Sequence, residues 1–169
     1  MATDAGFPTL KPAFTALLNI APGLPVGTLS AGQNLTWVNI LSGTLVSEPD
    51  YPVKVNANLV SGADWIHGDP DGKIQRLDVR SIFKTDDGAL LNFSYLGAIH
   101  MDSEIASIFQ GTAKPGLVTS WRGVTHKFLQ TGTEAYKRLE NDVFIAVGRF
   151  HVKEDAVVVE YKISYVEHE

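Results

Sequence analysis

Apolar and polar residues alternate over many short stretches of this chain, which is the pattern of β-strands with one buried face. The clearest alternation is YPVKVNANLV, residues 51–60, in which Lys54, Asn56 and Asn58 separate the apolar positions. The last stretch, AVVVEYKISYVE at residues 156–167, alternates in the same way, and residues 35–46 are also rich in strand-forming residues. These patterns predict strands rather than amphipathic helices.

Turn residues separate the strand-like stretches at short intervals. The sequence TDDG, residues 85–88, joins two such stretches, and Asp-Gly between β-rich runs is a strong hairpin signal. DPDG at residues 69–72 and KED at residues 153–155 are further turns. The sequence therefore predicts β-hairpins over residues 73–100 and 143–167.

Two stretches have a helical period instead. Ile105, Ile108 and Phe109 have the i, i+3, i+4 spacing of one helix face, with Ser103 as the expected N-cap and Gly111 as the end. Residues 133–141 form a second expected helical turn. Both stretches are short, so they are connections within a β protein.

Seven to nine short strands with only brief helical pieces indicate an antiparallel sandwich or barrel. A barrel of about eight strands leaves no exposed edge and can hold one small ligand. The length of 169 residues corresponds to one domain. We expect a flexible segment over residues 1–12 and a single β domain over residues 13–169.

Composition restricts the partners and the compartment. The net charge of -5 argues against a cationic surface for nucleic acid, and the absence of cysteine excludes disulfides and thiolate chemistry. No run of about 18 apolar residues and no leader-like N-terminus occurs. We therefore expect a cytoplasmic protein with no nucleic-acid or membrane partner. A homodimer would suit a small barrel with an exposed mouth, although no residue pattern requires it.

Familiar motifs for phosphate, metal or nucleophilic chemistry do not occur in the chain. It has neither a P-loop, nor a strand-GxGxxG-helix unit, nor a GxSxG nucleophile elbow. The five histidines form no pair at helical or strand spacing, so a metal would need ligands from distant strands. We expect no cofactor and no metal.

Candidate chemistry concentrates in residues 61–91, where charged residues are dense. Asp78 and Arg80 share one strand face, and the opposite face of residues 77–83 is core-like. The pair is either a solvated surface ion pair or, if its face points into a barrel, a buried pair that polarises a carbonyl or enol oxygen. Asp64 and Trp65 end a strand, where they either plug the barrel or line its mouth. Periodicity leaves these alternatives open.

The stretches GADW, LDVR and TDDGA, with KFLQTGTEAYKRLENDVFIAVGRF and VVVEYKISYVE, resemble the domain-of-unknown-function family 3237, over residues 14–166. The resemblance implies an all-β fold: an antiparallel, calycin-type, lipocalin-like β-barrel of about eight strands with one or two short helices. It also implies a ligand region in the barrel interior and mouth, to which Asp64, Trp65, Asp78 and Arg80 would belong, but no established catalytic set. Gln130 stands where the family has a carboxylate, so we expect no carboxylate chemistry there.

Fungal proteins that this chain resembles occur in natural-product biosynthesis. The resulting hypothesis is a cofactor-independent enzyme that catalyses cyclisation, isomerisation or a Diels-Alder-type cycloaddition of a hydrophobic polyketide- or terpenoid-like substrate. The alternatives are a lipocalin-like carrier of a hydrophobic small molecule, and a structural module with a filled barrel. The expected catalytic residues are Arg80, Asp78, Asp64 and His100. The expected substrate-binding residues are Trp37, Tyr51, Trp65, Tyr95, Phe109 and Trp121.

Overall fold

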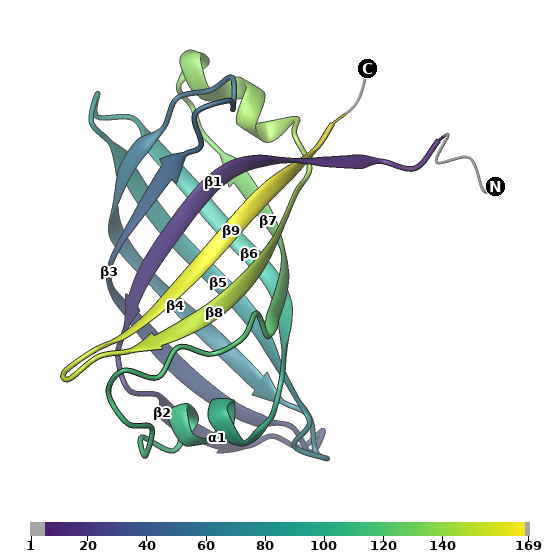
Figure 1. The fold of residues 1–169 in the computed structure, drawn as a ribbon, viewed down its shortest axis with the longest axis vertical. Coiled ribbons are helices and arrows are strands. Elements are labelled where there is room, and N and C mark those ends of the chain that lie inside the picture. Colours follow the sequence, from purple (N-terminus) through teal and green to yellow (C-terminus); the bar gives the residue numbers. More distant parts are fainter. Residues whose placement is uncertain (1–5, 168–169) are drawn as a thin grey trace.

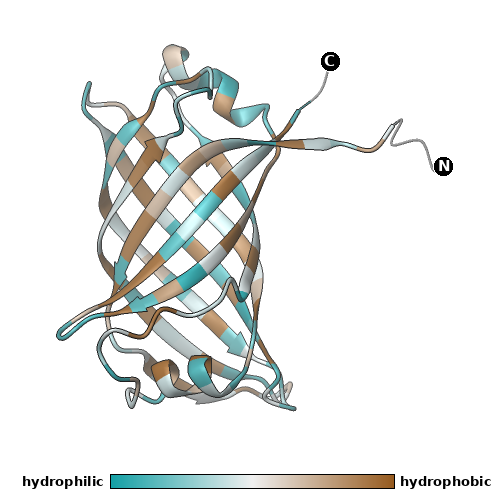
Figure 2. Ribbon diagram, in the orientation of Figure 1, coloured by the Kyte–Doolittle hydropathy of each residue, from teal (hydrophilic) through white to brown (hydrophobic). Residues whose placement is uncertain are grey.

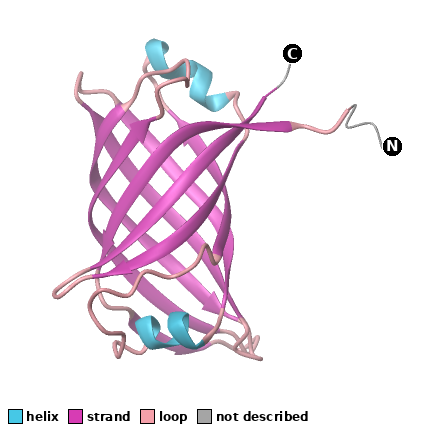
Figure 3. Ribbon diagram, viewed as in Figure 1, coloured by secondary structure: helices cyan, strands magenta, loops and turns pink. Residues whose placement is uncertain are grey.

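The computed structural model describes residues 6–167, in which nine antiparallel strands wind around one axis (Figures 1 and 3). The strands are β1 (Thr9–Ile20), β2 (Leu24–Thr28), β3 (Asn34–Ser47), β4 (Asn56–Gly68), β5 (Ile74–Thr85), β6 (Leu90–His100), β7 (Gly123–Gln130), β8 (Phe144–Val152) and β9 (Val157–Glu167). Two short helices complete the fold, α1 (Ser103–Phe109) and the 3-10 helix η1 (Glu134–Glu140). Within this part of the chain, neither helix has the length and apolarity needed to cross a membrane.

The sheet closes because β1 pairs on both of its edges. The strand order is β1-β9-β8-β7-β6-β5-β4-β3-β2, and β1 also pairs with β3, so eight strands form a closed barrel and β2 is an extra strand beside β3. The long pairings of β1 with β9 and with β3 run antiparallel, with bulges near Pro12 and Asn19. The expected antiparallel barrel of about eight strands is therefore confirmed, and the sandwich alternative is wrong.

Side chains alternate between the interior and the outer wall along the strands of the barrel, whereas all five residues of β2 are exposed. In β7 and β8 every second residue is buried, and Figure 2 shows hydrophobic and hydrophilic positions alternating along the ribbons. The buried set includes Phe14, Leu45, Phe83, Phe93 and Phe144, which are at most 1% exposed. The barrel interior is thus the hydrophobic core of the molecule.

Both ends of the barrel are covered by connecting segments (Figure 1). At one end lies the connection from β6 to β7, which carries α1 and inserts Ile105 into the core, where it is fully buried. Asp102 and Arg122 form an ion pair, 2.9 Å between Oδ2 and Nε, across the base of this connection. At the other end, η1 and residues 48–55 cover the barrel.

Most of the expected local structure is present, with three differences. The hairpins at residues 85–88 and 153–155 and the turn at 69–72 lie where expected, and Thr133 is the N-cap of η1. However, the N-cap of α1 is Asp102 rather than Ser103, because the Asp102 carboxylate accepts the Ile105 N–H. Residues 51–55 precede β4 instead of belonging to it, and residues 9–12 form the start of β1. Residues 1–5 lie outside the described residues.

Gly148 allows an aromatic ring to lie against the barrel wall. It is opposite Tyr161 in the β8–β9 register, and a Cβ at position 148 would lie 2.5 Å from Tyr161 Cε1. Real Cβ atoms do not approach a ring so closely, so the Tyr161 ring can occupy this position only because residue 148 has no side chain.

Replacing Gly148 by alanine should therefore displace the Tyr161 ring and lower the free energy of unfolding by about 1–3 kcal/mol, the range for overpacking a dense core. Urea denaturation measures this change. Gly123→Ala is the matched control, because it is also a strand glycine of the barrel wall but the nearest heavy atom to its Cβ would be 3.7 Å away. Equal destabilisation by both substitutions would contradict this account of Gly148.

Candidate functional site

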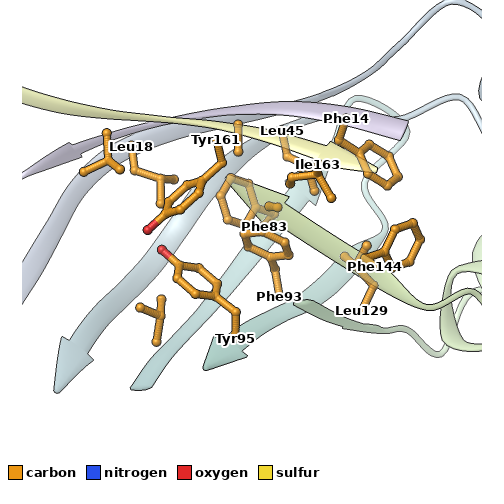
Figure 4. Close-up of a cluster of buried hydrophobic side chains, with 14 of the residues drawn as sticks. Phe14, Leu18, Leu45, Phe83, Phe93, Tyr95, Leu129, Phe144, Tyr161 and Ile163 are labelled. Atoms are coloured by element: carbon orange, nitrogen blue, oxygen red, sulfur yellow. The ribbon is translucent and has the colours of Figure 1, made fainter. Parts of the chain in front are cut away.

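Four ionisable side chains from four strands gather in the middle of the barrel: Asp64 from β4, Tyr95 from β6, Lys127 from β7 and Tyr161 from β9. All four are buried, with between 3% and 9% of their surface exposed. The apolar side chains of Phe83 and Phe93 lie beside Tyr95 and Tyr161 (Figure 4). We call these four residues the interior polar cluster.

A bulge in β4 decides that Asp64 points inward. Ala57 and Asp64 are both buried although they are seven positions apart, and in a regular strand two such residues would lie on opposite faces. The register of β4 against β5 shifts between Leu59 and Ser61, which adds the extra residue that reverses the faces. The same shift turns Trp65 to the outer wall. Gly62, a lone glycine in a strand-like stretch, is the sequence signal that indicates such a bulge.

Lys127 points inward because its strand pairs in register with β6. Tyr95 is opposite Lys127 and Phe93 is opposite Leu129, and all four side chains face the interior. The sequence GVTHKFLQ conceals this arrangement, since Val124 and Phe128 on the other face are more apolar than Lys127 and yet lie outside, 57% and 51% exposed. Sequence reasoning therefore missed Lys127, and only the pairing partners reveal it.

The Lys127 ammonium position is enclosed by aromatic faces. Its Nζ lies 3.2 Å from the ring centroid of Tyr95, 3.4 Å from that of Tyr161 and 5.3 Å from that of Phe93. Among the described residues, Nζ has no hydrogen-bond partner, and neither does the hydroxyl of Thr125 on the same inner face of β7. Burial lowers the pKa of Lys127 well below its ordinary value of 10.5, and the charge of Asp64 opposes this shift.

Burial shifts the pKa of Asp64 in the opposite direction to that of Lys127, because the uncharged form of a carboxyl group is the protonated one. Its Oδ1 accepts the backbone N–H of Asp78 at 3.1 Å. Burial is the main reason that the pKa of Asp64 rises from 3.8 to about 7, and the negative charge of Asp78 adds to this rise. The hydrogen bond from the Asp78 N–H and the positive charge of Lys127 act against it. Asp64 is therefore a carboxyl group that exchanges its proton near neutral pH.

The two tyrosines face each other across the interior. Their ring centroids are 5.3 Å apart, and their hydroxyl groups point toward one another (Figure 4). Burial raises the pKa of both phenols, so both remain proton donors at neutral pH. The interior polar cluster thus contains an acid, an amine and two phenols in a space with little access to water.

The other expected catalytic residues lie outside the barrel. Arg80 is on the outer face of β5 with 73% of its side chain exposed, and its Nε is 3.6 Å from Asp78 Oδ1. Asp78 and Arg80 therefore form a solvated surface ion pair and not a buried pair inside the barrel. His100 is exposed at the end of β6. The structure brings neither Arg80 nor His100 to Asp64.

The expected substrate-binding aromatics are dispersed over the molecule, and only Tyr95 belongs to the interior polar cluster. Trp37 and Trp65 pair across β3 and β4 and face outward, and Trp65 is 38% exposed, so it neither plugs the barrel nor lines its mouth. Tyr51 is fully buried at the η1 end, where its hydroxyl donates to Asp142 at 2.6 Å. Phe109 and Trp121 lie near the α1 end and are 39% and 40% exposed.

Two of the surface cavities formed by the described residues lie on the barrel wall, and neither of these contains a member of the interior polar cluster. One, of about 300 Å³, lies between β1, β9 and Glu48, and the other, of about 370 Å³, lies beside Tyr136, Asp86 and Asp87. Across residues 6–167, the structure brings no three histidine or carboxylate side chains together in a way that would hold a metal ion. The candidate chemistry is therefore that of the enclosed cluster.

Solved structures share this fold at low sequence identity. A conserved protein of unknown function from Rhodopseudomonas palustris has a TM-score of 0.78 at 19% identity, over 96% of this chain and 100% of that one. A β-barrel-like protein from Acinetobacter baumannii has a TM-score of 0.74 at 21% identity, over 99% and 100%. A structure described as an enzyme from Penicillium herquei has a TM-score of 0.64 at 16% identity, over 99% and 100%. Among curated proteins, none matches the chain.

Fold and site together define a closed, eight-stranded antiparallel β-barrel with an ionisable cluster in its interior. The family model described as "Protein of unknown function (DUF3237)" matches residues 8–166. The chain belongs to this family, and the resemblance inferred from the sequence motifs is confirmed.

The stability of the folded barrel should depend on the protonation of Asp64. Because burial raises the folded-state pKa above 3.8, the protonated carboxyl stabilises the fold, and this contribution is present below about pH 4 and lost as pH rises through about 7. Lys127 acts in the opposite direction, since its lowered pKa makes the free energy of unfolding rise with pH up to about 10.5. Comparison with an Asp64→Asn variant separates the contribution of the Asp64 carboxyl group to the pH dependence of stability from that of Lys127.

Relative to Asp64→Asn, the wild-type free energy of unfolding should fall between pH 4 and pH 8 by at most about 4 kcal/mol, which corresponds to about three pKa units. Urea titrations at several pH values measure the difference. Asp155→Asn, an exposed carboxylate in the β8–β9 turn, should leave the wild-type curve unchanged. Parallel curves for wild type and Asp64→Asn would show that Asp64 has an ordinary pKa.

Proposed function

We propose that this protein is a cofactor-independent enzyme that catalyses cyclisation, isomerisation or cycloaddition of a hydrophobic, polyketide- or terpenoid-like molecule inside the barrel. The observation that carries the proposal is the burial of Asp64 beside an amine and two phenols inside an apolar barrel, and this burial raises the pKa of Asp64 to about 7, in the range that suits general acid–base catalysis. A carboxyl group with no bulk water beside it transfers protons selectively to a bound substrate.

Each member of the interior polar cluster has a role in this proposal. Asp64 gives or takes the proton at carbon or oxygen, and the phenols of Tyr95 and Tyr161 donate hydrogen bonds to an oxygen on which negative charge develops. The phenylalanines packed around the cluster, such as Phe83 and Phe93, are the apolar surface that a substrate would contact once these side chains move apart to admit it. Arg80, Asp78 and His100 receive no catalytic part, because their side chains lie on the outer wall or at the end of β6.

One structural neighbour supports an enzymatic role. The structure from Penicillium herquei is described as that of an enzyme, and its barrel overlies almost the whole chain. At 16% identity this likeness concerns the fold alone, so the choice of reaction rests on the chemistry of the interior polar cluster.

A panel of conjugated enones, polyenes and quinone methides tests the proposal, with products separated by chiral chromatography. We expect wild-type protein to change the rate and the stereochemical ratio of product formation for at least one compound. Asp64→Asn should lower the enzymatic rate by about a hundredfold or more, the usual contribution of a general acid or base. Asp155→Asn should retain the full rate.

Two outcomes would contradict the proposal. A carrier would bind members of the panel and raise their solubility without changing product ratio or rate. The other outcome is a folded Arg80→Leu variant that loses turnover while Asp64→Asn keeps it in full. That pair of results would show that the catalytic residues lie on the outer wall of the barrel.

A further inference from the structure

We infer that Lys127 forms a covalent iminium with a carbonyl substrate, an aldehyde or an enone, and holds it between the rings of Tyr95 and Tyr161. This inference rests on the proposed function for the arrival of a substrate in the barrel, and it names the substrate class. The geometry at Nζ is its main support.

The surroundings of Nζ suit an iminium better than an ammonium ion. An ammonium has three N–H groups, and in the described part of the chain none of them finds an acceptor. An iminium nitrogen has only one N–H, so it leaves fewer buried donors without partners. Its positive charge is still attracted by the two ring faces, 3.2 and 3.4 Å from Nζ at their centroids.

Burial also supplies the reactive form of the lysine. Only an unprotonated amine attacks a carbonyl carbon, and desolvation in an apolar pocket is one of the ways in which proteins activate lysine for Schiff-base chemistry. The lowered pKa of Lys127 agrees with this activation. The hydroxyl of Thr125, which is buried on the same face and has no hydrogen-bond partner within residues 6–167, is a further polar group that a bound substrate can satisfy.

The step balances with groups that the interior polar cluster contains. The Nζ lone pair attacks the carbonyl carbon, and the electrons of the C=O π bond move to oxygen. The carbinolamine then loses its oxygen as water as the C=N bond forms. One hydrogen of this water comes from Nζ and the other from the protonated carboxyl group of Asp64. A neutral amine, a neutral carboxyl group and a carbonyl thus become an iminium, a carboxylate and one water molecule.

An iminium would make the proposed reactions easier. It withdraws electrons from an adjacent C=C bond, which favours conjugate addition, double-bond isomerisation and cycloaddition. The Asp64 carboxylate that results is then the counter-ion of the iminium and a base for the next proton transfer.

Reductive trapping tests the inference on the intact wild-type protein. Acetaldehyde and cinnamaldehyde are added separately at pH 7 with sodium cyanoborohydride, and intact mass followed by peptide mapping locates the adducts. We expect one main adduct per chain, on Lys127, formed at least about tenfold faster than on the exposed Lys84, because burial gives Lys127 a larger unprotonated fraction. Cinnamaldehyde should also give a red-shifted absorption band without the reductant.

Matched variants separate reactivity from a structural role. Lys84→Met should keep the main adduct. Lys127→Met should lose it, and Lys127→Arg should also lose it, although a long basic side chain remains at this position. Two results would overturn the inference. In the first, surface lysines of the folded protein are labelled but Lys127 is not. In the second, Lys127 is labelled only after the protein is unfolded in urea.

The two proposals fail in different ways. If Lys127 is unmodified but Asp64→Asn still abolishes turnover of a panel compound, the enzyme proposal stands and the covalent step is wrong. If Lys127 is trapped but no compound of the panel is converted, the iminium site stands and the proposed reaction is wrong.

Discussion

Closure of the sheet by the pairing of β1 with both β9 and β3 is the constraint on which the rest of this structure depends. An open sheet has two faces and two edges, but a closed barrel divides every strand residue into an interior and an exterior position. The interior of an eight-stranded barrel is narrow, so each inward side chain meets others from several strands. A single change of register in β4 therefore moves a carboxyl group from solvent to the centre of the core.

The interior polar cluster is costly for a barrel of this size. Moving an ion out of water costs several kcal/mol even after relaxation, whereas a desolvated cation–π contact contributes about 2 kcal/mol. Two aromatic faces therefore offset only part of the cost of burying Lys127 as an ammonium ion. Neutralisation offsets the remainder, which agrees with the lowered pKa of Lys127 and the raised pKa of Asp64. An apolar residue at position 127 would avoid this cost, so the presence of lysine favours a chemical role over a purely structural one.

Much of the fold could be predicted from the sequence, because hairpin turns and strand alternation are local properties. The turns at residues 69–72 and 85–88, the caps around η1 and the core-like face of residues 77–83 depend on neighbours within a few positions. Less of the candidate site could be predicted. The sequence indicates Asp64 and Tyr95 as site residues, but it also indicates the pair of Asp78 and Arg80, which the structure places on the outer wall.

Local periodicity and short motifs are enough to predict an all-β chain, its hairpins and its family. Which charged residues lie inside the barrel depends on how the strands pair. The bulge after Leu59 turned Asp64 inward and Trp65 outward, and pairing with β6 placed Lys127 inside although its strand has the more apolar face outside. The face of a strand that points into the barrel depends on its pairing partners and on the number of residues between bulges. The residue pattern of a single strand contains neither.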